Sequence, residues 1–374
     1  MGHPVKAFLS NSRIAIVITN LCGGGAERVA VNLANDFIKR GYPVDMVLLS
    51  VTGEILQDLL PAVRVVDLQV ERMRGLLFPL IRYLRDHRPV ALLANMWPIT
   101  SIAMLACKIA MVDTRLVVVE HTTWSRSEIC KSRFKRWQVA TLMRFTFPFV
   151  DGIVTVSFGA AEDLARFANL NYSDITVIYN PIIGNFNSLA NGLMPHIVGW
   201  SDSRCRLLAV GKLKTIKDFA TLLKAFSLIP SNLDARLLIL GEGECRAELE
   251  LQAKKLGIQD RVFMPGFITD PTPFYKQADL FVLTSIAEGF GNVVAEALAV
   301  GLPVVSTDCP SGPREILSDG KFGSLVPVGD SKALALAIVK SLNIAHDRTE
   351  LIARAQYFSI DKAAEKYIDI LFGR

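Results

Sequence analysis

Short runs of β-branched and other apolar residues alternate with helical patterns along the first half of the chain. Six runs predict strands, at residues 14–19, 44–49, 63–67, 91–94, 116–120 and 153–156. These runs lack polar alternation, which is typical of strands buried on both faces. We therefore expect a parallel sheet that is covered by helices on both sides.

A second series of the same kind begins after residue 200. Its predicted strands are residues 207–210, 237–240, 262–264, 280–283, 304–306 and 324–326. Between the two series, a stretch containing Asn, Pro and Gly has little periodicity and is expected to be a connector. The chain is thus predicted to be α/β, with two Rossmann-like, doubly wound domains of residues 1–185 and 186–359. A last helix, predicted over residues 360–372, is expected to cross back so that residues 360–374 pack on the first domain.

Composition favours a globular protein with a large core. The chain has 374 residues, of which 51% are hydrophobic and 21% charged, and this length exceeds that at which one core stops growing. No uncharged apolar stretch reaches the roughly 20 residues that span a bilayer, and no early segment resembles a signal peptide. Six cysteines lie far apart, which fits neither a zinc ribbon nor a redox dithiol. These features predict a cytoplasmic protein.

The net charge of +5 comes entirely from the first half of the chain. Residues 1–185 hold 20 Lys and Arg against 15 Asp and Glu, whereas residues 186–374 hold 21 of each. The basic residues gather at 72–88 and 126–144, interleaved with aromatic and aliphatic side chains. Such a surface suits peripheral contact with anionic lipids at the inner face of the cell membrane. The alternative interpretation is a helix face that is simply exposed to solvent. No recognised nucleic-acid-binding module accompanies the charge, so nucleic acid is not expected as a partner.

Two glutamates frame a small-residue turn that follows the strand predicted at residues 280–283. The turn reads Glu288-Gly289-Phe290-Gly291-Asn292, and Glu296 falls in the helix expected over residues 292–299. Open α/β sheets bind ligands at the carboxyl ends of their strands. Two carboxylates there can accept hydrogen bonds from neighbouring hydroxyls, which favours a polyhydroxylated ligand such as a sugar nucleotide.

Two further strand-to-helix loops carry groups suited to an anion. After the first strand, three glycines allow close backbone approach and precede a helix start that offers free N–H groups: Gly23, Gly24 and Gly25. After the first strand of the second series, Gly211 opens a loop that contains Lys212 and Lys217, whose ammonium groups can neutralise a diphosphate. A simple tight turn and solvated lysines are the alternative interpretations of these loops taken alone.

A fourth loop, Ser311-Gly312-Pro313-Arg314-Glu315, again follows an apolar strand. Together with the glycine triplet, the lysine loop and the two glutamates seven residues apart, it resembles the family-4 retaining glycosyltransferases of the GT-B fold. The resemblance spans nearly the whole chain, in the family's order. It implies two Rossmann-like domains facing across a cleft, with a nucleotide-sugar donor bound mainly by the C-terminal domain and the acceptor mainly by the N-terminal one.

The resemblance also implies roles for individual residues. Glu296 would accept hydrogen bonds from the ribose hydroxyls, Glu288 would face the donor sugar, and Lys217 matches the family's diphosphate-binding lysine. Lys212 stands where the family usually has an arginine, so the charge is kept and the bidentate fork is lost. His121 looks like the residue that reaches the donor sugar and the reaction centre. The other donor-binding positions carried over are Gly23, Gly24, Gly25, Gly211, Phe290, Gly291 and Asn292.

The implied reaction is transfer of a sugar, with retention, from a nucleoside diphosphate sugar to a hydroxyl of a lipid-linked saccharide or envelope polysaccharide precursor. Uridine is expected as the base on family frequency alone. No Asp-X-Asp pair occurs in the sequence, so neither a metal nor another cofactor is expected. Two alternatives stay open: a sugar-nucleotide epimerase of the same architecture, which would need further acid and base residues, and a non-catalytic sugar-nucleotide-binding module.

Overall fold

The computed structural model describes residues 12–182, 184 and 196–374. The chain divides into two compact units. The first ends at Ile182 and also takes in Ser359–Arg374, and the second runs from Ile183 to Phe358. The boundary predicted at residues 185 and 186 lies outside the described residues.

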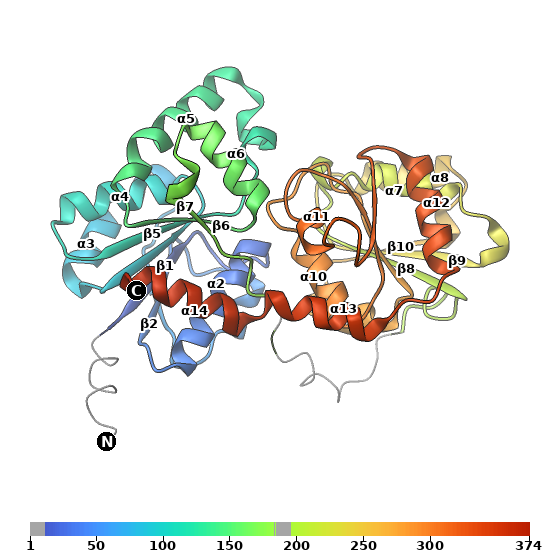
Figure 1. The fold of residues 1–374 in the computed structure, drawn as a ribbon, viewed down its shortest axis with the longest axis horizontal. Coiled ribbons are helices and arrows are strands. Elements are labelled where there is room, and N and C mark those ends of the chain that lie inside the picture. Colours follow the sequence, from blue (N-terminus) through green and yellow to red (C-terminus); the bar gives the residue numbers. More distant parts are fainter. Residues whose placement is uncertain (1–11, 183, 185–195) are drawn as a thin grey trace. The chain divides into compact units, whose positions relative to one another are not determined.

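A seven-stranded sheet forms the centre of the first unit (Figure 1). Its strands are β1 (Ile14–Ile18), β2 (Val44–Leu48), β3 (Arg64–Asp67), β4 (Ala91–Asn95), β5 (Arg115–Glu120), β6 (Gly152–Thr155) and β7 (Ile175–Val177). Neighbouring strands pair in parallel in the order β3-β2-β1-β4-β5-β6-β7. The order reverses between β1 and β4, which is where sheets of this kind open a crevice at their carboxyl edge.

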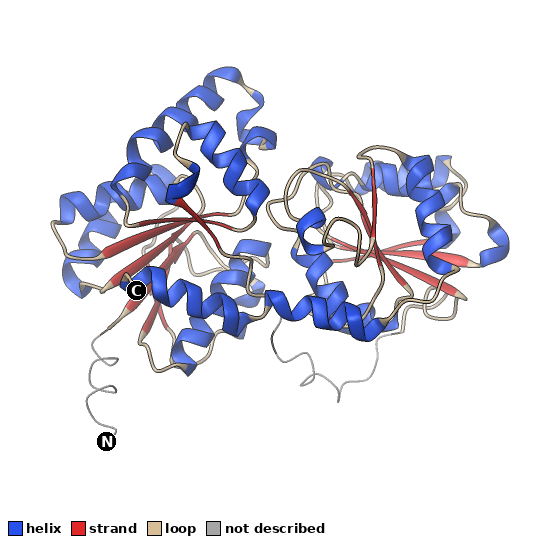
Figure 2. Cartoon of the chain, in the orientation of Figure 1, coloured by secondary structure: helices blue, strands red, loops and turns tan. Residues whose placement is uncertain are grey.

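Helices cover both faces of this sheet (Figure 2). They are α2 (Gly25–Lys39), α3 (Leu77–His87), α4 (Ile99–Ala110), α5 (Arg133–Thr146), α6 (Phe158–Ala168) and α14 (Ile360–Phe372). Helices α3 to α6 share one core with Ala15 and Val17 of β1, whereas α2 and α14 pack together on the other face. Side chains alternate between the two faces of a strand, and helices cover both faces of this sheet. All five residues of β1 are therefore buried.

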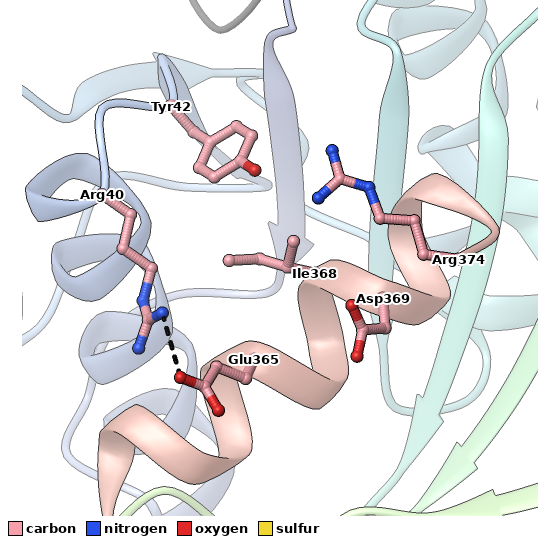
Figure 3. Close-up of a pocket in the computed structure, with 6 residues that line it drawn as sticks. All are labelled: Arg40, Tyr42, Glu365, Ile368, Asp369 and Arg374. Carbon is pink, nitrogen blue, oxygen red and sulfur yellow. Dashed lines mark ion pairs between the residues drawn. The ribbon is translucent and has the colours of Figure 1, made fainter. Parts of the chain in front are cut away.

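Helix α14 is fixed to the first unit by packing and by charge. Tyr42 stacks on Phe372 with 5.3 Å between ring centroids, and Arg40 lies 3.7 Å from Glu365 beside a polar hollow of about 370 Å³ (Figure 3). A Cβ at Gly152, at the start of β6, would lie 2.7 Å from Cδ1 of Ile370. A side chain at this position would displace the end of Ile370, so the glycine allows α14 to pack closely against β6.

The second unit repeats the design with a six-stranded parallel sheet. Its strands are β8 (Cys205–Val210), β9 (Ala235–Leu240), β10 (Val262–Gly266), β11 (Leu280–Leu283), β12 (Val304–Thr307) and β13 (Ser324–Val326). The order is β10-β9-β8-β11-β12-β13, so the reversal falls between β8 and β11. Its helices are α7 (Phe219–Ser227), α8 (Arg246–Lys255), α9 (Thr272–Gln277), α10 (Asn292–Ala299), α11 (Pro313–Ile316), α12 (Ser331–Leu342) and α13 (Arg348–Ala355).

The predicted class of two doubly wound parallel sheets is confirmed. Each predicted strand is present, with ends shifted by at most two residues. Strand β7 was not predicted. The expected burial on both faces is wrong for β3, whose residues are mostly exposed because it is an edge strand with charged ends. Among the helices that the structure describes, none is both long and apolar enough to cross a membrane.

Candidate active site

In the second unit, the predicted site residues gather where the strand order reverses. Residues 211–218 follow β8 and residues 284–291 follow β11, and these two strands are neighbours. Both loops leave the carboxyl ends of their strands, so they lie at one edge of the sheet. Two hydrogen bonds join the loops: Ile286 N donates to Ile216 O at 2.8 Å, and the side-chain Oγ1 of Thr284 donates to Lys217 O at 2.9 Å.

A partly buried ion pair lies between these loops. Lys217 Nζ donates to Oε1 of Glu288 at 2.6 Å, and Ser285 Oγ donates to the same oxygen at 2.6 Å. The side chains of Lys217 and Glu288 are 23% and 11% exposed. Each charge fixes the position of the other, so neither must be recruited from solvent when an anion binds.

The local sequence fixes the position of Lys217. A 3-10 turn, Thr215–Lys217, ends at Asp218, which adopts a left-handed conformation with φ 46° and accepts from Thr221 N to cap α7. A Cβ at Gly211 would lie 3.7 Å from Cδ and Cε of Lys217, so the lysine side chain passes over this glycine. Lys212, the other predicted cation, is exposed.

Helix α10 carries Glu296 and begins at the turn after β11. Gly291 caps it with φ 93°, a conformation that glycine adopts without strain. Glu296 Oε2 accepts from the hydroxyl of Tyr275 at 2.9 Å. Burial, and then the charge of Glu296, raises the pKa of Tyr275 well above its ordinary value, so the phenol stays a hydrogen-bond donor that orients the carboxylate. Phe290 is a core side chain, only 2% exposed, so its contribution to a ligand would come from its backbone.

The three predicted glycines of the first unit lie at the start of α2, and they are not equivalent. Gly23 has φ 76°, Gly24 is the N-cap residue with φ −77°, and Gly25 is the first residue of the helix. A Cβ at Gly24 would meet Oε2 of Glu27 at 2.1 Å. The carboxylate of Glu27 therefore lies beside this helix N-terminus, where negative charge is favourable.

The loop that follows β2, residues 49–55, is hydrogen-bonded to the glycine loop. Leu21 N donates to Thr52 O, and Ile55 N donates to Leu21 O, at 2.9 and 3.2 Å. Gly53 has φ 125°, and a Cβ there would lie 2.1 Å from the carbonyl of Leu21. Backbone contact of this kind leaves no room for a side chain, so Gly53 is a requirement of the loop that sequence reasoning missed.

His121 follows β5 and is held in its neutral form. Its Nε2 lies 3.2 Å from Oδ1 of Asn95, a residue at the end of β4 whose amide nitrogen faces the carbonyls of Val17 and Leu93. Burial lowers the pKa of His121 to about 4. With the proton on Nε2, Nδ1 is an acceptor, and it is buried with no hydrogen-bond partner among the described residues. Asn95 was not predicted, since asparagine at a strand end belongs to no motif.

The neighbouring Glu120 is a second group that sequence reasoning missed. It is 1% exposed, and its carboxyl accepts from Thr100 Oγ1 at 2.9 Å and from Trp97 N at 3.4 Å. Burial, which outweighs these hydrogen bonds, raises the pKa of Glu120 to about 8. The carboxyl is therefore mostly protonated at neutral pH, beside a histidine that is not.

The predicted residues thus form two groups, one in each unit. Lys217 and Glu288 are in direct contact, whereas His121 and the glycine triplet belong to the first unit with partners of their own. Within the described ranges, no group of three or more His, Cys, Asp or Glu residues is arranged to hold a metal ion.

Comparison with known proteins identifies the family. Residues 23–183 match the model described as "Glycosyltransferase Family 4", and residues 196–357 match "Glycosyl transferases group 1". The two matches together take in most of the chain and coincide with its two units. The protein belongs to the glycosyltransferases that these two models describe together.

Two relatives from Campylobacter jejuni carry long names that state their reactions. The N-acetylgalactosamine-N,N'-diacetylbacillosaminyl-diphospho-undecaprenol 4-alpha-N-acetylgalactosaminyltransferase is 32% identical over 59% of this chain and 58% of its own length, less than two thirds of that protein. The GalNAc-alpha-(1->4)-GalNAc-alpha-(1->3)-diNAcBac-PP-undecaprenol alpha-1,4-N-acetyl-D-galactosaminyltransferase is 26% identical over 96% of this chain and 98% of its own.

Solved structures share the fold. The HepE protein of Anabaena in complex with UDP-glucose superposes with a TM-score of 0.79 over 97% of this chain and 100% of that one, at 22% identity. At this identity the likeness establishes the architecture and not the ligand.

Proposed function

We propose that this protein is a retaining, metal-independent glycosyltransferase that moves a sugar from a UDP-sugar to a hydroxyl of a lipid-linked saccharide or envelope polysaccharide precursor. The observation that carries the proposal is the Lys217–Glu288 pair at the reversal of the second sheet. The names of the Campylobacter relatives, which act on undecaprenyl-diphosphate-linked saccharides, support the acceptor class. The UDP-glucose in the Anabaena structure supports the donor class.

In this proposal the second unit stabilises the leaving diphosphate. An ammonium group has three donors, and Glu288 takes one from Lys217, so others remain to be given to phosphate oxygens. Lys212 adds a more distant, solvated charge. The backbone N–H groups of Phe290, Gly291 and Asn292, at the start of α10, would help to orient the sugar and the diphosphate. Charge that develops on the departing phosphate would thus be met by groups already in place.

Retention follows if the acceptor attacks from the face that the phosphate leaves. The departing phosphate oxygen then takes the acceptor proton, and the protein mainly positions the two substrates. Glu288 is engaged by Lys217 and Ser285, which suits a carboxylate that orients the donor sugar better than one that attacks it. Glu296, oriented by Tyr275, would accept the ribose hydroxyls. His121 would reach the donor sugar through its unprotonated Nδ1.

The decisive experiment has two stages. A thermal-shift panel of UDP- and GDP-sugars should single out one donor, because a ligand that binds only the folded state raises the melting temperature by mass action. That donor is then incubated with and without undecaprenyl-diphosphate-linked saccharides, and with EDTA. We expect transfer with retained anomeric configuration, unaffected by EDTA. Conversion of the donor to an epimer without any acceptor would instead identify an epimerase, and binding without turnover would identify a binding module.

We also propose that the first unit contacts an anionic membrane through α5. At 100° per residue, the face of α5 opposite the buried Val139 and Met143 carries Phe134, Trp137 and Phe145, which are 62–66% exposed. Arg133 and Arg144 border this face of the helix, and Lys135 adds an exposed positive charge nearby. Aromatic rings with flanking cations are the composition of helices that lie in the headgroup region.

Liposome co-sedimentation tests this contact. Vesicles that contain about 30% phosphatidylglycerol have a negatively charged surface that attracts basic segments. They should retain the wild type, whereas vesicles of phosphatidylcholine alone should not. The double variant Phe134→Ser/Trp137→Ser should lose most of the retention. Leu336→Ser, which removes a similarly exposed apolar side chain from α12, serves as the matched control. Equal retention of all proteins by both vesicles would refute the contact.

A further inference from the structure

Two loops of the candidate donor site rest on one short segment at the end of the second unit. The segment is residues 354–358, from the last turn of α13 through the 3-10 turn Gln356–Phe358. Phe358 is the last residue of the second unit, and Ser359 begins the part of the chain that returns to the first. None of these residues carries a motif, and sequence analysis gave them no role.

Arg354 holds the end of α11. Its Nε donates to Ile316 O at 2.9 Å and its Nη2 donates to Glu315 O at 2.5 Å. The last carbonyls of a helix have no partner within the helix, so a guanidinium that takes two of them fixes where the helix ends. The same guanidinium lies over the rings of Phe322 and Phe358, at 5.5 and 5.1 Å. Hydrogen bonds in its plane and rings against its faces together restrict it to one orientation.

Phe358 in turn holds the donor loop. Its ring meets that of Phe290 edge to face, with 5.3 Å between centroids and 72° between planes, and the two side chains are 1% and 2% exposed. Phe290 directly precedes Gly291, the residue that caps α10. The position of the Phe290 ring therefore sets the direction of the backbone at the start of α10.

The two supported loops also touch each other. Gly312 has φ 75°, and a Cβ there would lie 1.8 Å from the carbonyl oxygen of Phe290. Glu288 N faces Pro310 O at 3.5 Å. A displacement of α11 would therefore push on the backbone that presents Glu288 and the α10 N-terminus.

We infer that Arg354 and Phe358 are positioning residues for the donor: they act on the nucleotide sugar only through the loops that they hold. The inference rests on the proposed function, because it presumes that the loop at residues 288–292 binds a nucleoside diphosphate. It predicts that removing either side chain weakens nucleotide binding although neither one touches the nucleotide.

Isothermal titration with UDP, and with GDP in parallel, measures this effect. Arg354→Ala and Phe358→Leu should each weaken binding by about 5- to 30-fold, less than the loss of about 100-fold that a 1 Å misplacement of a reacting group can cause. Arg354→Lys keeps the charge but not the fork, so it should fall between the wild type and Arg354→Ala. In turnover the donor KM should rise while the acceptor KM stays unchanged.

The matched control is Arg261→Ala. Arg261 also lies over a ring of the second unit, that of Phe226 at 5.0 Å, but directly before β10 at the amino edge of the sheet. It should lower the melting temperature as Arg354→Ala does and leave nucleotide affinity unchanged. If Arg354→Ala does not fold, Arg354→Lys and Phe358→Leu decide the matter.

The outcomes separate this inference from the proposed function. Wild-type affinity in folded Arg354→Ala, Arg354→Lys and Phe358→Leu overturns the inference alone, as does an equal loss in Arg261→Ala. A wild type that binds neither UDP nor GDP overturns the proposed function and this inference with it.

Discussion

The carboxyl edges of the two sheets follow the same topology and carry opposite chemistry. In the second unit the groups at the reversal are charged and paired, as Lys217 and Glu288 show. In the first unit the titratable groups at the end of β5, one strand beyond the reversal, are neutral: the half-buried His121 has lost its proton, and the buried Glu120 has kept one. The difference agrees with the proposed function, in which one edge would neutralise a diphosphate and the other would contact an uncharged sugar and hydroxyl.

The most direct test of the charged edge is a substitution at Lys217. Replacing it with alanine should lower kcat by about two to three orders of magnitude, the scale seen when a preorganised group that stabilises charge is lost. Initial rates of UDP release at saturating donor and acceptor measure the effect. Lys214→Ala is the matched control, because Lys214 is an exposed lysine of the same loop. A variant at position 217 with wild-type turnover would remove the role assigned to the charged edge.

Glu296 should show a different kind of loss. Ribose contacts persist in both the ground state and the transition state, so Glu296→Ala should raise the donor KM by about tenfold or more and change kcat little. Tyr275→Phe, which keeps the carboxylate but removes the hydroxyl that orients it, should give a smaller increase. Steady-state kinetics with varied donor concentration distinguishes the two variants. An unchanged donor KM in Glu296→Ala would contradict the assignment.

Lys217 and Glu296 could be predicted from the sequence because they belong to motifs. Sequence reasoning also placed Lys217 and Glu288 on one edge although 71 residues separate them, since parallel strands in sheet order bring their carboxyl ends together. It missed Tyr275 and Asn95, because their roles depend on which side chain the fold brings beside them. The protonation of His121 was likewise beyond prediction, since burial sets it and burial is a property of the packed structure.

His121 tests the neutral edge in the reaction itself. His121→Asn should lower kcat by about tenfold, modest beside the factors of 10² to 10⁴ that acid–base groups contribute. With a pKa of about 4, the imidazole stays uncharged from pH 5.5 to 8, so the ratio of wild-type to variant rates should be constant across that range. Measuring kcat at half-unit steps checks this. A ratio that changes around pH 6.5 would mean that the histidine titrates normally and that the edge is not neutral.

Glu120 tests the same edge through stability. Its pKa of about 8 in the folded protein lies above the ordinary value of 4.5, so the stability it contributes is complete below pH 4.5 and is lost as pH rises towards 8. The slope is at most about 1.4 kcal/mol per pH unit. Glutamine cannot ionise, so Glu120→Gln removes this slope while other groups, His121 included, titrate as before.

Urea unfolding of the wild type and Glu120→Gln at pH 5, 6, 7 and 8 isolates that contribution, because the difference between the two free energies cancels the shared background. Glutamine replaces one acceptor oxygen with a donor, which adds an offset of about 1 kcal/mol that does not vary with pH. The difference should therefore shift in favour of Glu120→Gln by about 3 to 4 kcal/mol from pH 5 to pH 8. Parallel curves would mean that Glu120 is already ionised at pH 5, and the first edge would then carry a buried charge as the second one does.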